Sequence, residues 1–232
     1  MEISKKYFGN KTLRLQECKT QGLSVPPFVA IPSTLSLRLF KDPKFRQSSA
    51  EKIILEIPNC HYAVRSSALI EDSPNHSFAG QFETKLNVSA HNLAQAIQEV
   101  LEQASQYLEG NLDSFSLLIQ KYIAPDSAGV IFTRNPLGHR EMLIEYTTGN
   151  GESLVGGKIK PQKISFYNTE PIPKELLKIG IGETQRKIFH DLETKYQFPQ
   201  DIEFCIKNNI FYFLQVRPIT SITKQQYEEI LF

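Results

Sequence analysis

The pattern of apolar and polar side chains changes character near residue 115. Before it, apolar positions recur mostly at helical spacing, with short β-prone runs between them. After it, short runs rich in Val, Ile, Phe and Tyr follow one another, separated by Gly, Pro and Asn. The pattern predicts helices within residues 11–20, 33–58, 92–108, 174–196 and 222–232. It predicts strands at residues 28–31, 61–65, 82–88, 115–123, 129–133, 142–146, 163–167, 201–206 and 211–217. These strands come in hairpin-like groups without βαβ alternation, which predicts an α+β fold with mostly antiparallel sheets.

The last two strands form the clearest predicted hairpin. Residues 201–206 (Asp-Ile-Glu-Phe-Cys-Ile) and 211–217 (Phe-Tyr-Phe-Leu-Gln-Val-Arg) alternate in polarity, and Lys-Asn-Asn at 207–209 is a turn signal. Packing constrains the register, because a slip of one residue moves every side chain to the other face. The register that gathers the apolar side chains on one face pairs Phe204 with Leu214, Ile202 with Val216, and Ile206 with Tyr212. This register requires a loop with an odd number of residues.

The other face of the predicted hairpin collects polar groups. The same register sets Glu203 opposite Gln215 and places Asp201 near Arg217. Mg²⁺ takes oxygen ligands, which Asp201, Glu203 and the Gln215 carbonyl supply, and an arginine can hold phosphate oxygens through two parallel hydrogen bonds. The hairpin therefore suits phosphoryl transfer. For the hairpin alone, the simpler interpretation is a solvated face with an exposed Asp–Arg ion pair worth ~0–1 kcal/mol.

Further segments suit phosphate groups. Arg65 and two following serines end a predicted strand, and a small-residue turn at 77–81 could turn backbone amides toward an anion. A glycine-containing stretch at 149–157 permits close backbone approach or a hinge, and Lys11 precedes the first predicted helix. Each feature also has a simpler interpretation: Arg65 pairing with the acidic residues at 71–72, glycines that only form turns, and a lone lysine without function.

Composition narrows the class of protein. The 232 residues include 26 basic and 25 acidic side chains, and no long run of Lys or Arg suggests a nucleic-acid partner. Residues 1–11 lack the apolar stretch of a signal peptide, and nowhere do 18 apolar residues run together, so we expect a cytoplasmic protein without a membrane partner. Three cysteines, an odd number, favour a reducing compartment, and the five histidines lack zinc-ligand spacing.

Taken in order, the segments resemble the nucleotide-binding domain shared by phosphoenolpyruvate synthase, pyruvate phosphate dikinase and rifampin phosphotransferase, an ATP-grasp module. The residues that carry this resemblance are 9–29, 64–67, 77–87, 120, 129–133, 149–161 and 201–218. The resemblance implies an ATP-grasp fold of two lobes. The shortened N-terminal lobe would comprise residues 1–114, and the C-terminal lobe, with the metal-binding hairpin, residues 115–232.

The resemblance also implies which residues bind ATP and Mg²⁺. Lys11 and Arg65 would contact phosphates, and Gln120 would lie near the adenine. Glu203 and Gln215 match the metal-binding pair of the family, and Asp201 and Arg217 match the acid and arginine at the reacting phosphates. The implied nucleotide-binding residues are Lys11, Arg65, Gly80, Thr84, Lys85, Gln120, Glu203, Gln215 and Arg217. The implied metal ligands are Asp201, Glu203 and Gln215, and the implied catalytic residues are Lys11, Arg65, Asp201 and Arg217.

Three features depart from the family pattern. The glycine-rich opening, usually Gly-Gly-Lys-Gly-Ala-Asn, stands here as Phe-Gly-Asn-Lys-Thr-Leu at residues 8–13, and the segment between residues 32 and 61 is shorter than usual. The sequence also contains no Thr-Ser-His-like segment with a phosphorylatable histidine. We therefore expect an ATP- and Mg²⁺-dependent phosphotransferase that acts on a histidine of a separate protein or on a small molecule. The alternatives are an ATP-grasp ligase that forms an acyl phosphate, and a nucleotide-binding module without turnover.

Overall fold

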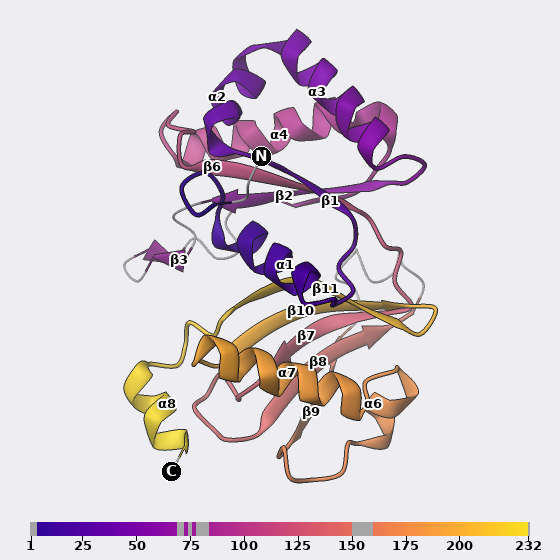
Figure 1. Ribbon diagram of the computed structural model, residues 1–232, viewed down its shortest axis with the longest axis vertical. Helices are drawn as coiled ribbons and strands as arrows, with labels where there is room; N and C mark the ends of the chain where they lie inside the picture. Colours follow the sequence, from indigo (N-terminus) through magenta and orange to yellow (C-terminus); the bar gives the residue numbers. More distant parts are fainter. Residues whose placement is uncertain (1–3, 69–71, 74–75, 78–83, 150–159, 232) are drawn as a thin grey trace. The chain divides into compact units, whose positions relative to one another are not determined.

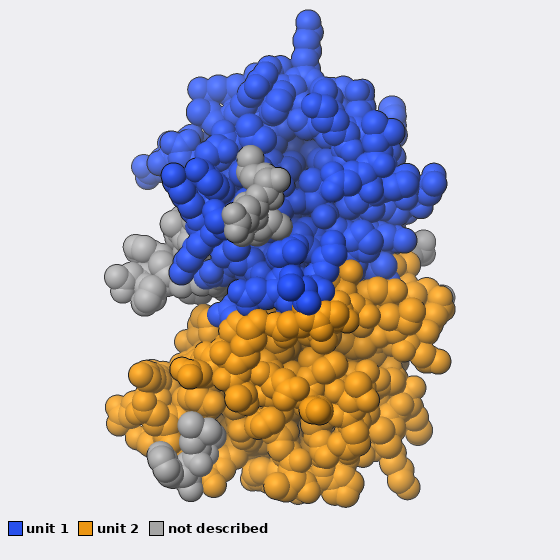
Figure 2. Space-filling view, viewed as in Figure 1, with its two compact units in different colours: residues 1–20, 26–123 blue, residues 21–25, 124–232 orange. Residues whose placement is uncertain are grey.

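The computed structural model describes residues 4–68, 72–73, 76–77, 84–149 and 160–231 (Figure 1). The chain divides into two compact units (Figure 2). Unit 1 comprises residues 1–20 and 26–123, and unit 2 comprises residues 21–25 and 124–232. None of the described helices has both the length and the apolar character needed to cross a bilayer.

Unit 1 is built on a four-stranded antiparallel sheet. The strands, in spatial order, are β1 (Phe28–Ile31), β6 (Phe115–Lys121), β2 (Tyr62–Ala68) and β5 (Lys85–Val88). One face is covered by α2 (Ser33–Lys41), α3 (Pro43–Glu56) and α4 (Leu93–Tyr107), whereas α1 (Asn10–Thr20) lies on the other face (Figure 1). A 3₁₀ turn, η1 (Ala90–Asn92), leads into α4, and β3 (Asp72–Ser73) and β4 (His76–Ser77) form a separate short ladder.

The core of unit 1 follows from the helical period of α4. Its buried residues recur every three or four positions, so that one stripe of the helix faces the sheet. They are Leu93, Ala96, Ile97, Val100, Leu101 and Ala104. From the sheet, Tyr62 and Val64 of β2 and Ile119 of β6 enter the same core. Because side chains alternate along a strand, the residues between them face α1 instead.

Unit 2 is built on a five-stranded antiparallel sheet. Its strands, in spatial order, are β11 (Ile210–Pro218), β10 (Gln200–Lys207), β7 (Ser127–Phe132), β8 (Met142–Thr148) and β9 (Gln162–Phe166). The helices are α6 (Lys174–Lys178), α7 (Glu183–Tyr196) and α8 (Lys224–Leu231). Phe189 of α7 packs on Phe211 of β11, with ring centroids 5.7 Å apart, and Phe204 of β10 stacks on Phe211 at 5.0 Å.

The α+β class is confirmed, because every strand pair among the described residues is antiparallel. The compact units, however, divide later than the lobe boundary expected after residue 114. Strand β6 lies between β1 and β2 in the unit 1 sheet, so unit 1 continues to Ile123. Alternation along a strand shows which face is buried, but it does not show which sheet the strand joins.

The hairpin of β10 and β11 contains a β-bulge that the sequence analysis does not predict. Three expected pairs are present: Asp201 with Arg217, Ile202 with Val216, and Glu203 with Gln215. The register then shifts between Glu203 and Phe204, and Leu214 is the extra residue. Beyond the bulge, Phe204 pairs with Phe213 and Ile206 with Phe211. The expected pairs Phe204–Leu214 and Ile206–Tyr212 are therefore wrong.

The turn explains this difference. Asn208 and Asn209 have positive φ angles of 50° and 61°, as in a two-residue turn of type I′. The odd-numbered loop is therefore also wrong, because the bulge supplies the extra residue within β11 instead. This arrangement buries both Phe211 and Phe213, which are 8% and 2% exposed, on the core side.

Candidate functional site

Unit 1 gathers three of the predicted site residues on the sheet face that carries α1. The register pairs Arg65 with Leu118 and Ala63 with Gln120, so Arg65 and Gln120 are diagonal neighbours on one face. Both side chains are buried, with exposures of 7% and 2%. From the first turn of α1, Lys11 donates a hydrogen bond from Nζ to the carbonyl oxygen of Ser66, at 2.9 Å.

Gln120 has an unsatisfied donor on this face. Its Nε2 is buried, and no described residue accepts a hydrogen bond from it. Leaving a buried amide donor unpaired costs about 1–3 kcal/mol. A ligand with an acceptor atom, such as a ring nitrogen, would remove that cost. The chemistry of Gln120 therefore fits its expected position near a nucleotide base.

Among the other residues of unit 1 expected at the nucleotide, the structure describes Thr84 and Lys85. Thr84 is half-buried just before β5. Lys85 pairs with Val64, a core residue, and its Nζ lies 3.0 Å from Oε2 of Glu99 on α4. The ammonium group of Lys85 therefore points to the helix-covered face. Gly80, residues 150–157 of the glycine-containing stretch and the side chains at 71–72 lie outside the described residues.

Unit 2 holds an ion pair at the end of the hairpin. Arg217 donates a hydrogen bond from Nε to Oδ2 of Asp201 at 2.8 Å, and its Nη2 forms an ion pair with the same oxygen at 2.7 Å. The other oxygen, Oδ1, is buried, and no described residue donates a hydrogen bond to it. Burial raises the pKa of Asp201, the charge of Arg217 opposes that rise, and the charge of Glu203 adds to it. A cation at Oδ1 would relieve both the missing bond and the repulsion.

Glu203 and Gln215 complete this polar face. Asp201 and Glu203 are two positions apart on β10, so both project from the face opposite Ile202 and Phe204. Glu203 is half-buried, and Gln215 opposite it is 5% exposed. In the part of the chain that the structure describes, no group of three His, Cys, Asp or Glu side chains could hold a metal ion. The hairpin offers two carboxylates and one amide oxygen, which fit Mg²⁺ as a partial set of ligands to be completed by water or phosphate oxygens.

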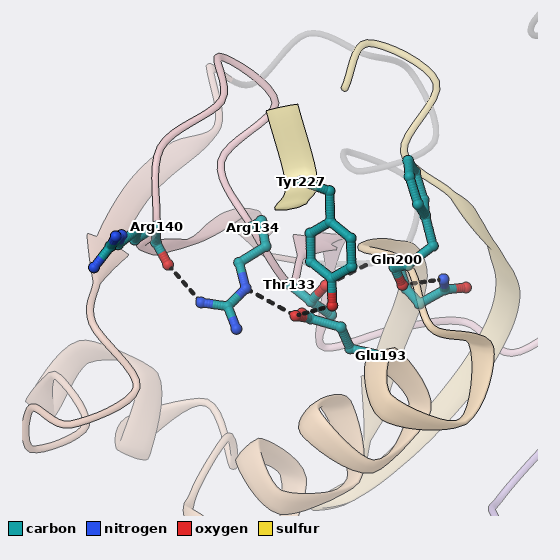
Figure 3. A network of polar contacts seen from close by, with 7 residues as sticks. Thr133, Arg134, Arg140, Glu193, Gln200 and Tyr227 are labelled. Atoms are coloured by element: carbon teal, nitrogen blue, oxygen red, sulfur yellow. Dashed lines mark hydrogen bonds and ion pairs between the residues drawn. The ribbon is translucent and has the colours of Figure 1, made fainter. Parts of the chain in front are cut away.

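A polar network fixes the start of β10 beside Asp201 (Figure 3). The Thr133 N–H donates to the Gln200 carbonyl, and the Gln200 N–H donates to Thr133 Oγ1, both at 2.9 Å. Next to Thr133, Arg134 Nε donates to Glu193 Oε1 at 2.8 Å, and Tyr227 of α8 donates to the same oxygen at 3.3 Å. These bonds connect the two residues that follow β7 with β10, α7 and α8 within unit 2.

The sequence analysis missed this network, although one signal was present. Glu193 is 3% exposed and lies four residues after Phe189, on the apolar stripe of α7. An acid on such a stripe requires a buried partner. Nothing in the local pattern, however, identifies Arg134 as that partner.

Comparison with known proteins relates the sequence of this chain to a family. The family described as pyruvate phosphate dikinase, AMP/ATP-binding domain, matches residues 48–191 and 182–231. An uncharacterized phosphotransferase, YvkC of Bacillus subtilis, is 28% identical over 97% of this chain and 35% of its own length. A rifampicin phosphotransferase of Bacillus cereus is 32% identical over 69% of this chain and 23% of its own length. A probable phosphoenolpyruvate synthase of Methanocaldococcus jannaschii is 31% identical over 72% of this chain and 18% of its own length. The chain thus spans about a third or less of these relatives.

Solved structures show the same fold at low sequence identity. D-Alanine-D-alanine ligase from Helicobacter pylori aligns with 97% of this chain and 59% of its own, with a TM-score of 0.53 and 14% identity. This likeness shows the ATP-grasp fold expected from the sequence, and it shows the fold alone. Because the family match covers most of the sequence, the chain belongs to the pyruvate phosphate dikinase AMP/ATP-binding domain family.

Proposed function

We propose that the protein is an ATP- and Mg²⁺-dependent phosphotransferase. The observation that carries the proposal is the buried Oδ1 of Asp201, which lacks a donor among the described residues and lies on one strand with Glu203. A buried anionic oxygen next to a second carboxylate is stabilised by a divalent cation. Membership of an AMP/ATP-binding family and relatives named phosphotransferases support ATP as the ligand that accompanies this cation.

The residues of unit 2 would bind the metal and a phosphate. Glu203, Gln215 and Oδ1 of Asp201 would hold Mg²⁺, which, when bound, neutralises charge on the transferring phosphate. Arg217 would bind phosphate oxygens, and its hydrogen bond and ion-pair contact with Asp201 orient its guanidinium group. Holding this fork in place before ATP arrives lowers the cost of ordering it.

The residues of unit 1 would bind the rest of the nucleotide. Lys11 and Arg65 would add positive charge at the phosphates, and Gln120 would donate from Nε2 to an acceptor of the adenine. Phosphoryl transfer needs mainly positioning and charge neutralisation, so no nucleophilic side chain is required. The phosphoryl acceptor would be a histidine on a separate protein or a small molecule.

Phosphorus NMR of the purified protein with Mg-ATP and a pool of acceptors from a lysate tests the proposal. We expect nucleotide turnover, with AMP plus phosphate or ADP identifying the phosphate that is attacked. Glu203→Gln, which keeps the shape but removes the charge, should reduce turnover by about 10²-fold or more.

A control variant that contacts the turn of the same hairpin separates the effect of charge at the proposed metal site from a general loss of structure. Asp126 lies at the turn end, where its carboxylate binds Lys207 Nζ at 2.6 Å and the Asn208 N–H at 2.9 Å. Asp126→Asn should therefore leave turnover unchanged. Formation of an amide with release of ADP would establish a ligase instead, and tight ATP binding without turnover for any acceptor would establish a binding module.

A further inference from the structure

The segment that carries Lys11 is fixed to the sheet by a buried cluster of hydroxyl and backbone groups. On one side of Lys11, the Gly9 N–H donates to the Ser67 carbonyl and to Ser116 Oγ, each at 3.2 Å. On the other side, Thr12 donates to Ser67 Oγ from its backbone N–H at 3.2 Å and from its hydroxyl at 3.0 Å. Lys11 is therefore held between two anchored residues.

Ser116 connects three segments that are distant in the sequence. It belongs to β6, accepts from Gly9 at the start of α1, and donates its hydroxyl hydrogen to the Ser67 carbonyl at the end of β2. Thr12, Ser67 and Ser116 are each 0% exposed. The Thr12 hydroxyl donates to the Ser67 hydroxyl, and the Ser116 hydroxyl bonds backbone groups on both sides. Such a buried network leaves few alternative arrangements of the backbone around it.

Gly9 shows how closely this segment approaches the strand. A Cβ atom at Gly9 would overlap the carbonyl oxygens of Ser67 and Ala68. The backbone at Gly9 thus lies directly against β2, and Lys11 follows two residues later.

We infer that Ser116, Ser67 and Thr12 are positioning residues for Lys11. They hold the backbone on both sides of Lys11, so that its ammonium group lies at the Ser66 carbonyl, next to Arg65, before any ligand binds. This inference rests on the proposed function, because it takes Lys11 to be a contact of the ATP phosphates. A lysine held in place loses less conformational entropy on binding than one on a loose segment.

Ser116→Ala tests the inference against a matched control, Ser36→Ala. Ser36 is a 0% exposed serine on α2 whose hydroxyl donates to the Phe115 carbonyl of the same strand from the opposite face. Both variants remove a buried hydroxyl bond at the same place in the sheet, so both should lower thermal stability similarly. Calorimetric titration with Mg-ATP should show affinity about fivefold weaker for Ser116→Ala, and within about twofold of the wild type for Ser36→Ala.

A double-mutant cycle with Lys11→Met separates positioning from general stability. Positioning predicts that Ser116→Ala no longer weakens ATP binding once the ammonium group is absent. An equal loss of affinity in both backgrounds would overturn the inference. If Ser116→Ala does not fold, Thr12→Val tests the same inference, because it replaces only the hydroxyl that bonds Ser67. Thr12→Val should weaken Mg-ATP binding in the same way, and Thr12→Ser, which keeps a hydroxyl, should bind Mg-ATP as the wild type does.

Failure of the inference is distinguishable from failure of the proposed function. If Lys11→Met binds Mg-ATP as tightly as the wild type while Glu203→Gln does not, the positioning role is wrong and the proposed function stands. If the wild type binds no Mg-ATP, both are wrong.

Discussion

Asp201 is ion-paired and yet incompletely satisfied. Oδ2 accepts a hydrogen bond from Arg217 Nε and is ion-paired with Arg217 Nη2, whereas Oδ1 accepts no hydrogen bond from any described residue. An acid that only stabilised the fold would be expected to place both oxygens on donors, because an unpaired buried oxygen is unfavourable. The asymmetry separates the two oxygens into one that orients the arginine and one suited to a cation.

Asp201→Asn should weaken Mg²⁺ binding while the hairpin still forms. The amide keeps the shape and loses the charge that holds Arg217, and removal of such an orienting group typically reduces metal affinity by about 10–100-fold. Mn²⁺ titration in the presence of ATP, followed by electron paramagnetic resonance, measures the change. Unaltered Mn²⁺ affinity in Asp201→Asn would show that Oδ1 does not face the metal.

Tyr62 gives the fold a dependence on alkaline pH. Burial, with a contribution from the Cys60 thiol, raises the pKa of Tyr62 to about 12 from 10.0. Because the folded pKa exceeds the unfolded value, the stabilising effect is complete below pH 10.0 and is lost as pH rises toward about 12. Urea unfolding from pH 8 to 11.5 should show the wild type losing stability through this range. Tyr62→Phe also loses the 2.7 Å hydrogen bond to the Ile57 carbonyl, so its free energy of unfolding should be lower at pH 8. Because it lacks the phenol, that free energy should fall less as the pH rises.

At the scale of elements, local pattern determines the helices and strands but not their partners. The six buried residues of α4 recur at helical spacing, so the helix follows directly from the sequence. The placement of β6 in unit 1 depends on hydrogen bonds to β1 and β2, which are remote in the sequence. For the candidate site, alternation correctly gave the pairs at Asp201 and Glu203. The contacts among Thr12, Ser67 and Ser116 leave no periodic signal, so the sequence does not reveal them.

The two-residue turn of the hairpin is a sensitive element. Asn209 has φ of 61°, which asparagine tolerates and β-branched residues do not. Asn209→Val should lower the free energy of unfolding by about 1–3 kcal/mol, whereas Asn209→Gly should change it little. Denaturant unfolding of both variants, with Asn168→Val in unit 2 as a control outside the turn, measures the difference. If Asn209→Val and Asn209→Gly lowered the free energy of unfolding equally, the positive φ angle of Asn209 would not be the cause of the loss.

At the scale of the molecule, each unit has its own sheet and core, and each contributes residues to the proposed function. The residues proposed to contact ATP are Lys11, Arg65 and Gln120 in unit 1, and those proposed to hold the metal and a phosphate are Asp201, Glu203, Gln215 and Arg217 in unit 2. The chain spans 35% or less of the length of the three curated relatives described above. Recognition of the phosphoryl acceptor is thus a separate question from nucleotide binding.

Mg-ATP should stabilise the folded protein increasingly as its concentration rises above its Kd. A ligand that binds only the folded state contributes about 2.7 kcal/mol at a concentration 100 times its Kd. Thermal unfolding with increasing Mg-ATP should therefore show a rising midpoint in the wild type and a smaller rise in Glu203→Gln. A midpoint that rises equally in both would show that Glu203 does not support nucleotide binding.

The bulge at Leu214 divides β11 into two stretches of opposite parity. Before it, the odd-numbered Phe211 and Phe213 face the core, and after it, the even-numbered Val216 does. If Leu214 were removed, the pairs on both sides of the bulge would keep their partners on β10 and their faces of the sheet. If a residue before or after Leu214 were removed instead, either Phe211 and Phe213 or Gln215 would move to the opposite face. In an alignment with other members of the family, a gap of one residue in this strand therefore belongs at position 214, and placing it elsewhere would misassign the side chains of the proposed metal site.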